Sequence, residues 1–235
     1  MLSSYSRETL KKVSTATLTT VLFKRGLRNV FIQGVFLLNR NAPRMVGESY
    51  TLRYIPARED VDQLGAFEGR GHPQREAIEA CPPGHVLVMD ARRDASAATG
   101  GDILMTRLMV RGAAGIVTDG GLRDTPTIEK LDFPVYCAAR SAPLNLVRHH
   151  AIDAQVPIGC GGVAVYPADV LVGDGEGVVV IPAKLADEVA QEAASQTEFE
   201  DWVEAKVKEG RSIFGLYPPN AETKAEFEAW KKGRK

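Results

Sequence analysis

The sequence has few cysteines, none at a metal-binding spacing, and no long apolar run. Its three cysteines, Cys81, Cys137 and Cys160, are far apart in 235 residues. This spacing argues against a disulfide framework and a CxxC-type zinc site, so we expect reduced, buried thiols in a cytoplasmic protein. Apolar runs such as 177–182 are too short to span a bilayer, and residues 1–12 lack the apolar core of a signal peptide.

The sequence also has no excess of acidic or basic residues. Lys and Arg number 29 and Asp and Glu number 30, which gives a formal net charge of −1. A dedicated binder of nucleic acid or anionic membrane usually carries a basic excess on one face, so we predict neither partner. The basic end, which includes Lys231, Lys232, Arg234 and Lys235, is typical of a solvated tail.

Apolar strands alternate with short helices through the middle of the chain. Residues 74–140 show this alternation, which predicts a mainly parallel sheet with covering helices. The segment 159–182 is rich in Val and Gly and is typical of two or three short strands in hairpins. Residues 57–71 are polar and punctuated by glycine, so we expect a loop that borders a site.

Helices are predicted at both ends of the chain. Ser6 and the periodic apolar residues after it indicate one capped helix that ends near Gly26. A long helix is predicted over residues 183–209, followed by an irregular tail over 210–235 that packs on a neighbouring subunit. Since no repeat or linker divides residues 1–235, we predict a single α/β domain.

The stretch ATGGDILMTRLMVRGAAGIVTDGGLRD, residues 98–124, places polar groups at two junctions. Gly100 and Gly101 precede a predicted helix, whose first amides are free to bind a carboxylate or phosphate. Arg123 and Asp124 follow a buried strand, at the end of the sheet where ligands of open α/β folds bind. These junctions, which also include Asp119, therefore mark a candidate site.

The residue types at these junctions suit a particular ligand. An arginine clamps a carboxylate, and an aspartate is a hard oxygen ligand for Mg²⁺ or Mn²⁺. Taken separately, a helix cap and a surface ion pair account for the same residues. Taken together, they favour a site for a small 2-oxo acid that chelates a divalent metal.

The pattern GGDIL…RGAAGIVTDGGLRD resembles the signature of the RraA-like family, which includes the metal-dependent 4-hydroxy-4-methyl-2-oxoglutarate aldolases. The resemblance extends from the first helix to GRSIFGLY near residue 217. It implies a swivelling β/β/α fold that assembles as a homotrimer or hexamer, with active sites between subunits.

The resemblance also implies roles for residues. The backbone of four residues would cradle the substrate carboxylate: Gly101, Asp102, Ile103 and Leu104. Arg123 would hold the pyruvyl portion and Asp124 would ligate Mg²⁺ or Mn²⁺, while the Asp102 side chain would lie close to the metal.

An acidic residue of the C-terminal helix is implied to reach the metal site of a neighbouring subunit through water. Glu200 and Asp201 occupy the matching positions, and Glu198 and Glu204 are alternatives. A solvated acidic helix face explains the same residues equally well.

The activity implied is a divalent-metal-dependent lyase that cleaves a 4-hydroxy-2-oxo acid to pyruvate through a metal-stabilised enolate. Dehydration of a 2-keto-3-deoxy sugar acid and decarboxylation of oxaloacetate remain alternatives on the same site. A third alternative is a regulator that binds an RNA-degrading endonuclease. The acids of the C-terminal helix favour catalysis.

We consider five further residues at this stage. Arg92 and Arg93, in MDARRDAS where relatives have a glycine-rich turn, would serve an anionic or hydroxylated substrate end or face solvent. His72 would line a pocket and transfer protons near neutral pH. His149 and the adjacent His150 are interpreted as a surface feature, because neighbouring residues on a helix face different directions.

Overall fold

The computed structural model describes residues 2–233, so Arg234 and Lys235 of the basic end lie outside it. The helices are α1 Ser4–Leu10, α2 Thr15–Lys24, α3 Pro73–Ala80, α4 Asp102–Val110, α5 Thr125–Ile128, α6 Ala186–Lys208 and α7 Ala221–Lys232, with 3₁₀ turns η1 Leu64–Phe67, η2 Asn145–Val147 and η3 Ala183–Leu185. The strands are β1 Phe36–Leu37, β2 Met45–Pro56, β3 His85–Asp90, β4 Gly115–Thr118, β5 Gly121–Leu122, β6 Val135–Cys137, β7 Ala139–Arg140, β8 His149–Ala154, β9 Ile158–Cys160, β10 Val163–Val165, β11 Val170–Gly173 and β12 Val178–Ile181.

The main sheet has the strand order β1-β6-β4-β3-β2-β11-β12, and β8 pairs with β2. Neighbours from β6 to β2 run parallel, which confirms the prediction for residues 74–140, and the outer strands are antiparallel. The long strand β2 pairs with β11 near its start and with β8 near its end. The register of the β2–β8 pairing shifts between Arg53 and Tyr54. The sheet therefore curls, and the ends of β3 and β4 lead into the loops of the predicted site.

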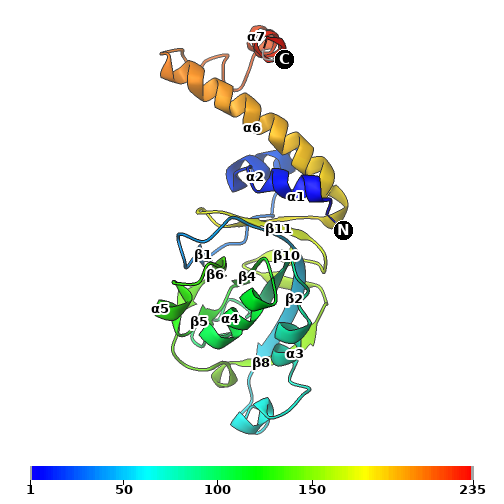
Figure 1. Cartoon of the computed structure of the whole chain (residues 1–235), viewed down its shortest axis with the longest axis vertical. Coiled ribbons are helices and arrows are strands. Elements are labelled where there is room, and N and C mark those ends of the chain that lie inside the picture. Colours follow the sequence, from blue (N-terminus) through cyan, green and yellow to red (C-terminus); the bar gives the residue numbers. More distant parts are fainter. Residues whose placement is uncertain (1, 234–235) are drawn as a thin grey trace.

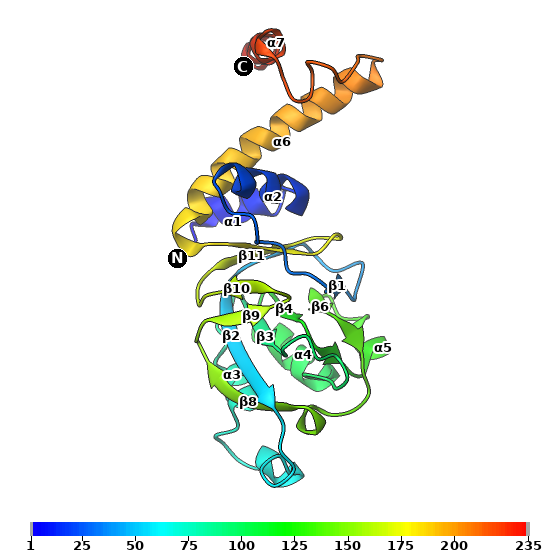
Figure 2. The ribbon, with the colours of Figure 1, turned by 180° about the vertical axis from the view of Figure 1, so that it is seen from behind.

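Helices cover the sheet in two groups (Figures 1 and 2). The helices α1, α2 and the first half of α6 share one apolar core with β11 and β12, and α3, α4 and α5 share another with β3 and β4. A third cluster joins the main sheet to the β9–β10 hairpin. Segment 159–182 thus contributes hairpin strands as predicted, although there are four of them where two or three were expected.

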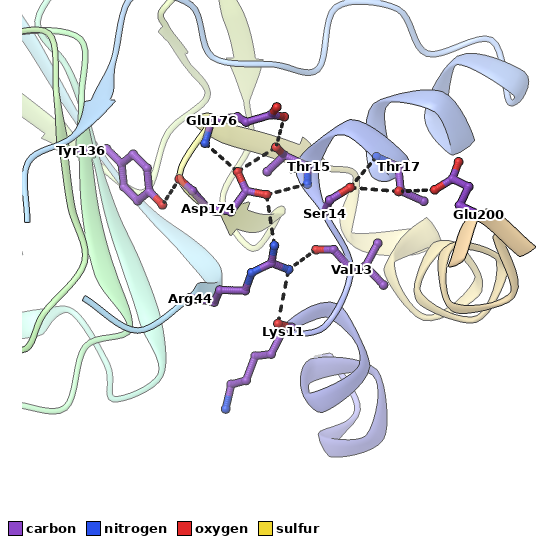
Figure 3. A network of polar contacts seen from close by, with 10 residues as sticks. All are labelled: Lys11, Val13, Ser14, Thr15, Thr17, Arg44, Tyr136, Asp174, Glu176 and Glu200. Atoms are coloured by element: carbon purple, nitrogen blue, oxygen red, sulfur yellow. Dashed lines mark hydrogen bonds and ion pairs between the residues drawn. The ribbon is translucent and has the colours of Figure 1, made fainter. Parts of the chain in front are cut away.

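The prediction of one helix that ends near Gly26 is wrong, because two helices, α1 and α2, occupy this segment. Ser3 caps α1, and the Ser14 hydroxyl accepts a hydrogen bond from the amide of Thr17 at the start of α2. The buried Asp174 carboxylate accepts hydrogen bonds from the Thr15 amide (2.8 Å) and hydroxyl (2.9 Å), which ties the break to the sheet (Figure 3). A second N-cap and a buried acceptor therefore divide the helix.

The tail after residue 210 is not irregular, which corrects the prediction. Residues 221–232 form α7, which packs on the outer half of α6 of its own chain. The apolar cluster between them consists of Phe199, Trp202, Val203, Leu216, Phe227 and Trp230. The outer half of α6 and α7 therefore project from the body together (Figure 1).

Two simpler expectations can also be checked. Cys81, Cys137 and Cys160 are buried free thiols, as predicted. Within residues 2–233, no helix has the length and hydropathy needed to cross a membrane.

Candidate active site

The two junctions predicted from the sequence meet at one cavity of about 260 Å³. It lies at the start of α4 and beside the turn that carries Arg123 and Asp124. Its lining residues are Leu64, Phe67, Gln74, Arg75, Ala98, Gly100, Gly101, Asp102, Ile103, Leu104, Arg123, Asp124, Leu144 and Asn145.

Gly101 allows the Arg123–Asp124 turn to lie directly against the helix start. Its backbone is extended, with φ −135° and ψ −175°, so any residue could adopt this conformation. A Cβ at this position, however, would lie 2.6 Å from Asp124 Oδ2 and 3.1 Å from Arg123 Cγ. Glycine thus allows the close approach of these two side chains, which a larger residue would displace, and its backbone freedom is not used here.

The Asp124 backbone is left-handed, with φ 55°. Arg123 Nε donates a hydrogen bond to Asp124 Oδ2 at 3.2 Å, and the two side chains are 46% and 44% exposed. An ion pair this exposed contributes little to stability. An aspartate in left-handed backbone beside a cavity is therefore a candidate functional residue.

The amides at the helix start are only partly free. No hydrogen bond within residues 2–233 involves the amide of Gly101 or Asp102. The Ile103 amide donates to Asp102 Oδ1 at 2.8 Å, and the Leu104 amide donates to the Gly101 carbonyl at 3.1 Å. The expected cradle of four free amides is therefore reduced to two, because the first turn satisfies the others internally.

The cavity fits a hard divalent ion better than a structural zinc. Its acidic lining residues are Asp102 and Asp124, and no group of three or more potential metal ligands occurs among residues 2–233. Structural zinc sites take four Cys or His ligands, whereas Mg²⁺ is usually held by one or two carboxylates with water and substrate oxygens. The Asp124 oxygen that approaches Gly101 belongs to this second kind of donor set.

Several lining residues were not identified from the sequence. Gln74 and Arg75 lie on α3 and Asn145 on η2, while Leu64 and Phe67 confirm that the loop 57–71 borders the cavity. Arg75 and Gln74 look like solvated positions of a short polar helix, so no sequence signal separates them from their neighbours. With Asn145 they come together only where α3 and η2 meet at the cavity in the folded chain.

Asp119, Arg92 and Arg93 lie outside the cavity. The buried Asp119 carboxylate accepts hydrogen bonds from three backbone amides, those of Ala91 (2.7 Å), Arg93 (3.2 Å) and Gly161 (3.0 Å). Burial raises the pKa of Asp119, and these amides oppose that effect. Asp119 organises the loop after β3, where Arg92 and Arg93 have positive φ and exposed side chains.

The histidines do not contribute to the cavity lining. The His72 ring packs against the Phe67 ring at a tilt of 57°, with ring centroids 4.8 Å apart, and burial lowers the pKa of His72. The surface interpretation of His149 is wrong: it lies in β8 and is fully buried. The adjacent His150 is partly buried, and its Nδ1 lies within hydrogen-bond distance of Asp62 Oδ1, at 2.7 Å.

The acids of the C-terminal helix are distant from the cavity of their own chain, because α6 packs with α1 and α2 (Figures 1 and 2). Glu200 accepts hydrogen bonds within its own chain from Thr17 (2.7 Å, Figure 3), Gln196 (2.8 Å) and Tyr217 (3.3 Å). The remaining acids differ in their contacts: Glu198 pairs with Lys231, Glu204 pairs with Lys208, and the Asp201 carboxylate has no hydrogen bond or ion pair within residues 2–233.

Comparison with known proteins gives a family match over most of the chain. A family model described as RraA-like, Aldolase/RraA, matches residues 15–180. A protein of Halalkalibacterium halodurans, provisionally named a 4-hydroxy-4-methyl-2-oxoglutarate aldolase, is 38% identical over 119 residues. That match covers 50% of this chain and 56% of the relative, so this chain spans about half of that relative's length.

Solved structures show the same fold. RraAS2 of Streptomyces coelicolor, described as an unusual member of the RNase ES inhibitor RraA protein family, matches with a TM-score of 0.76 and 29% identity. The match covers 86% of this chain and 96% of that one. An uncharacterized protein of Pseudomonas syringae matches with a TM-score of 0.78 at 24% identity, over 92% of this chain and 98% of that one.

Proposed function

Because this chain belongs to the RraA-like family, we propose that its cavity binds a small 2-oxo acid together with Mg²⁺ or Mn²⁺. In this proposal the protein is a carbon–carbon lyase that cleaves a 4-hydroxy-2-oxo acid to pyruvate. The observation that carries it is the approach of Asp124 to Gly101, beside two free amides and Arg123. The name of the Halalkalibacterium halodurans relative supports the reaction class.

Substrate binding uses groups that the fold already holds in place. The free amides of Gly101 and Asp102, at the positive end of the α4 dipole, bind the carboxylate next to the ketone. Arg123 donates to the same pyruvyl portion, because it lines the cavity and Asp124 is its only ion-pair partner within residues 2–233.

Asp124 is the residue that would hold the metal ion, with Asp102 close to it and water or substrate oxygens completing the ligand set. When bound, the ion supplies Lewis-acid stabilisation of the charge that develops on the ketone oxygen. Arg123 offsets the same negative charge. This charge forms only as the bond breaks, so stabilising it accelerates the reaction.

Asp102 is the group of this chain suited to the proton transfers. Its Oδ1 accepts from the Ile103 amide, and its Oδ2 has no hydrogen bond within residues 2–233. Oδ2 accepts the C4 hydroxyl proton as the C3–C4 bond breaks, which releases a carbonyl product and leaves the bonding pair on pyruvate as its enolate. Return of a proton to C3 completes pyruvate.

A neighbouring subunit completes the site in this proposal. The chain would assemble as a homotrimer or hexamer, with an acid of one C-terminal helix placed at the cavity of another subunit. Asp201 suits this role better than Glu200, because Glu200 is held by Thr17, Gln196 and Tyr217 of its own chain.

The test is release of pyruvate from 4-hydroxy-4-methyl-2-oxoglutarate in the presence of Mn²⁺. We expect EDTA to abolish the reaction reversibly and Asp124→Asn to lower kcat by at least about 10³-fold. Asp132→Asn removes an exposed carboxylate outside the cavity and is the matched control, with activity unchanged.

Other outcomes would contradict the proposal. Activity that resists EDTA, together with a covalent protein–substrate adduct that borohydride traps, would indicate a Schiff-base lysine. Loss of water or CO₂ from a panel of 2-oxo acids, without pyruvate release by cleavage, would assign the dehydratase or decarboxylase alternative. A protein inactive on the whole panel that inhibits an RNA-degrading endonuclease would be a regulator.

A further inference from the structure

A groove of about 840 Å³ is lined by residues of α2, of the middle of α6, and of α7 with the turn before it. Figure 1 shows α2 on the body and α6 extending past it towards α7. The groove shares no lining residue with the cavity of the proposed function. Its volume is in the range of sites that hold drug-sized ligands, so it is a second place where a small molecule can bind.

The apolar lining of the groove is largely aromatic. Phe199 and Phe227 meet edge to face, with ring centroids 5.2 Å apart and ring planes at 81°. Tyr217, a third ring of the lining, is 47% exposed, and Pro218 and Pro219 follow it. A planar aromatic ligand would cover this surface, and contacts between rings add to the gain from burying apolar area.

The charged lining residues of the groove have an excess of one positive charge. They are Lys24, Lys224 and Glu228. No ion pair within residues 2–233 includes any of the three, and Lys24 donates a hydrogen bond to the neutral Gln196 side chain at 3.0 Å. Glu228 offsets one of the two lysines, because it lies one turn along α7 from Lys224. The groove therefore suits a ligand with a single negative charge.

Hydrogen bonds hold part of this lining in place. Gln196 accepts from Lys24, and its Nε2 donates to Glu200 at 2.8 Å. Tyr217 donates to the same Glu200 oxygen at 3.3 Å, and Thr17 of α2 donates to the other oxygen at 2.7 Å. A lysine and an aromatic ring of the groove are thus positioned before a ligand binds, which lowers the entropy cost of binding.

A second copy of the chain fits the groove less well. The basic end of the chain has the same sign of charge as the groove. The large apolar side chain most exposed among residues 2–233 is Phe214, at 90%, and it ends the segment 206–214, which has three basic residues and one acidic residue. Either segment would bring positive charge to the lysines of the groove.

We infer that this groove is a binding site for a small aromatic monocarboxylate. The ring system of the ligand lies against Phe199, Tyr217 and Phe227, and its carboxylate pairs with the lysines of the groove, Lys24 and Lys224. Because the ligand contacts α2 as well as α6 and α7, it links the body to the projecting helices. The inference does not depend on the proposed function, which concerns the other cavity.

The test is calorimetric titration of the full chain with 2-naphthoate and with 2-naphthamide, which have the same ring system and differ in charge. Titration in EDTA excludes the divalent ion of the proposed function. We expect 2-naphthoate to bind about 5- to 20-fold more tightly than 2-naphthamide. The double variant Lys24→Gln, Lys224→Gln is expected to remove this preference and to keep the affinity for 2-naphthamide. The matched control Lys130→Gln, Lys184→Gln removes two exposed lysines outside the groove and is expected to retain the preference.

Two further variants locate the binding. Tyr217→Ser removes a half-exposed ring and is expected to weaken binding of both probes about 3- to 10-fold. Arg123→Met changes the other cavity and is expected to leave both affinities unchanged.

Three results would overturn the inference. They are equal affinity for the two probes, no binding of either probe, and loss of 2-naphthoate binding in Arg123→Met. Self-association that excludes 2-naphthoate and is lost in Phe214→Ser would also overturn it, because the groove would then bind a second copy. Pyruvate release is measured separately, so each of these results leaves the proposed function standing.

Discussion

His149 shows how much a single residue's environment decides its chemistry. Arg92 Nη2 donates to its Nδ1 at 3.1 Å, so Nε2 carries the hydrogen and donates to the Ala97 carbonyl at 3.3 Å. Both ring nitrogens are therefore occupied in the neutral form, and burial lowers the pKa of His149. The sequence could not show this, because a His-His pair has the same pattern on an exposed helix and on a half-buried strand.

This arrangement predicts a pH dependence of stability. Because the folded-state pKa lies below the unfolded value of about 6.5, the unfolded chain binds more protons as the pH falls below that value. Stability is thus complete above about pH 6.5 and is lost on acidification, by up to about 1.4 kcal/mol per pH unit for this group. Chemical denaturation between pH 7 and pH 5 should show that His149→Asn loses less unfolding free energy per pH unit than the unmodified protein does. Equal slopes for the two proteins would contradict the assignment.

At the scale of elements, periodicity and turn chemistry predicted the central strands, the helices between them and the two junctions that meet at the cavity. The junctions at residues 98–101 and 119–124 could be placed because parallel strands end at one edge of the sheet. The break between α1 and α2 and the strand β8 were missed. Each depends on distant partners, namely Asp174 for the break and β2 for the strand.

The junction of α4 with the 119–124 loop gives a prediction about Gly101. In Gly101→Ala the new Cβ displaces Asp124 and Arg123 from the helix start, and we expect kcat/KM for pyruvate release to fall about 10²-fold. The displaced side chains are half-exposed and φ is −135°, so the free energy of unfolding should change by less than about 1 kcal/mol.

Gly175→Ala is the matched control, because a Cβ there meets no atom within 4 Å. It should leave both activity and stability close to those of the unmodified protein. Full activity in Gly101→Ala would show that the close approach of Asp124 is irrelevant to the reaction.

At the scale of the whole molecule, the fold divides the chain into a body that builds the cavity and a projecting arm. The arm consists of the outer half of α6 and α7, joined by the cluster around Trp202 and Phe227. The long helix was predictable from composition, but α7 was not, because its apolar residues are few and pack with distant parts of the chain, namely α6 and Leu216. Arg75 and Asn145 were equally unpredictable, because α3 and η2 meet at the cavity only in the folded chain.

The central proposal is that Asp124 holds a divalent ion beside a bound 2-oxo acid. Anomalous diffraction from a crystal soaked with Mn²⁺ and pyruvate tests this most directly. We predict a manganese peak in contact with the Asp124 carboxylate, with the pyruvate carboxylate on the Gly101 and Asp102 amides and Arg123 alongside. A manganese peak elsewhere, or pyruvate bound in this cavity with no metal beside Asp124, would contradict it.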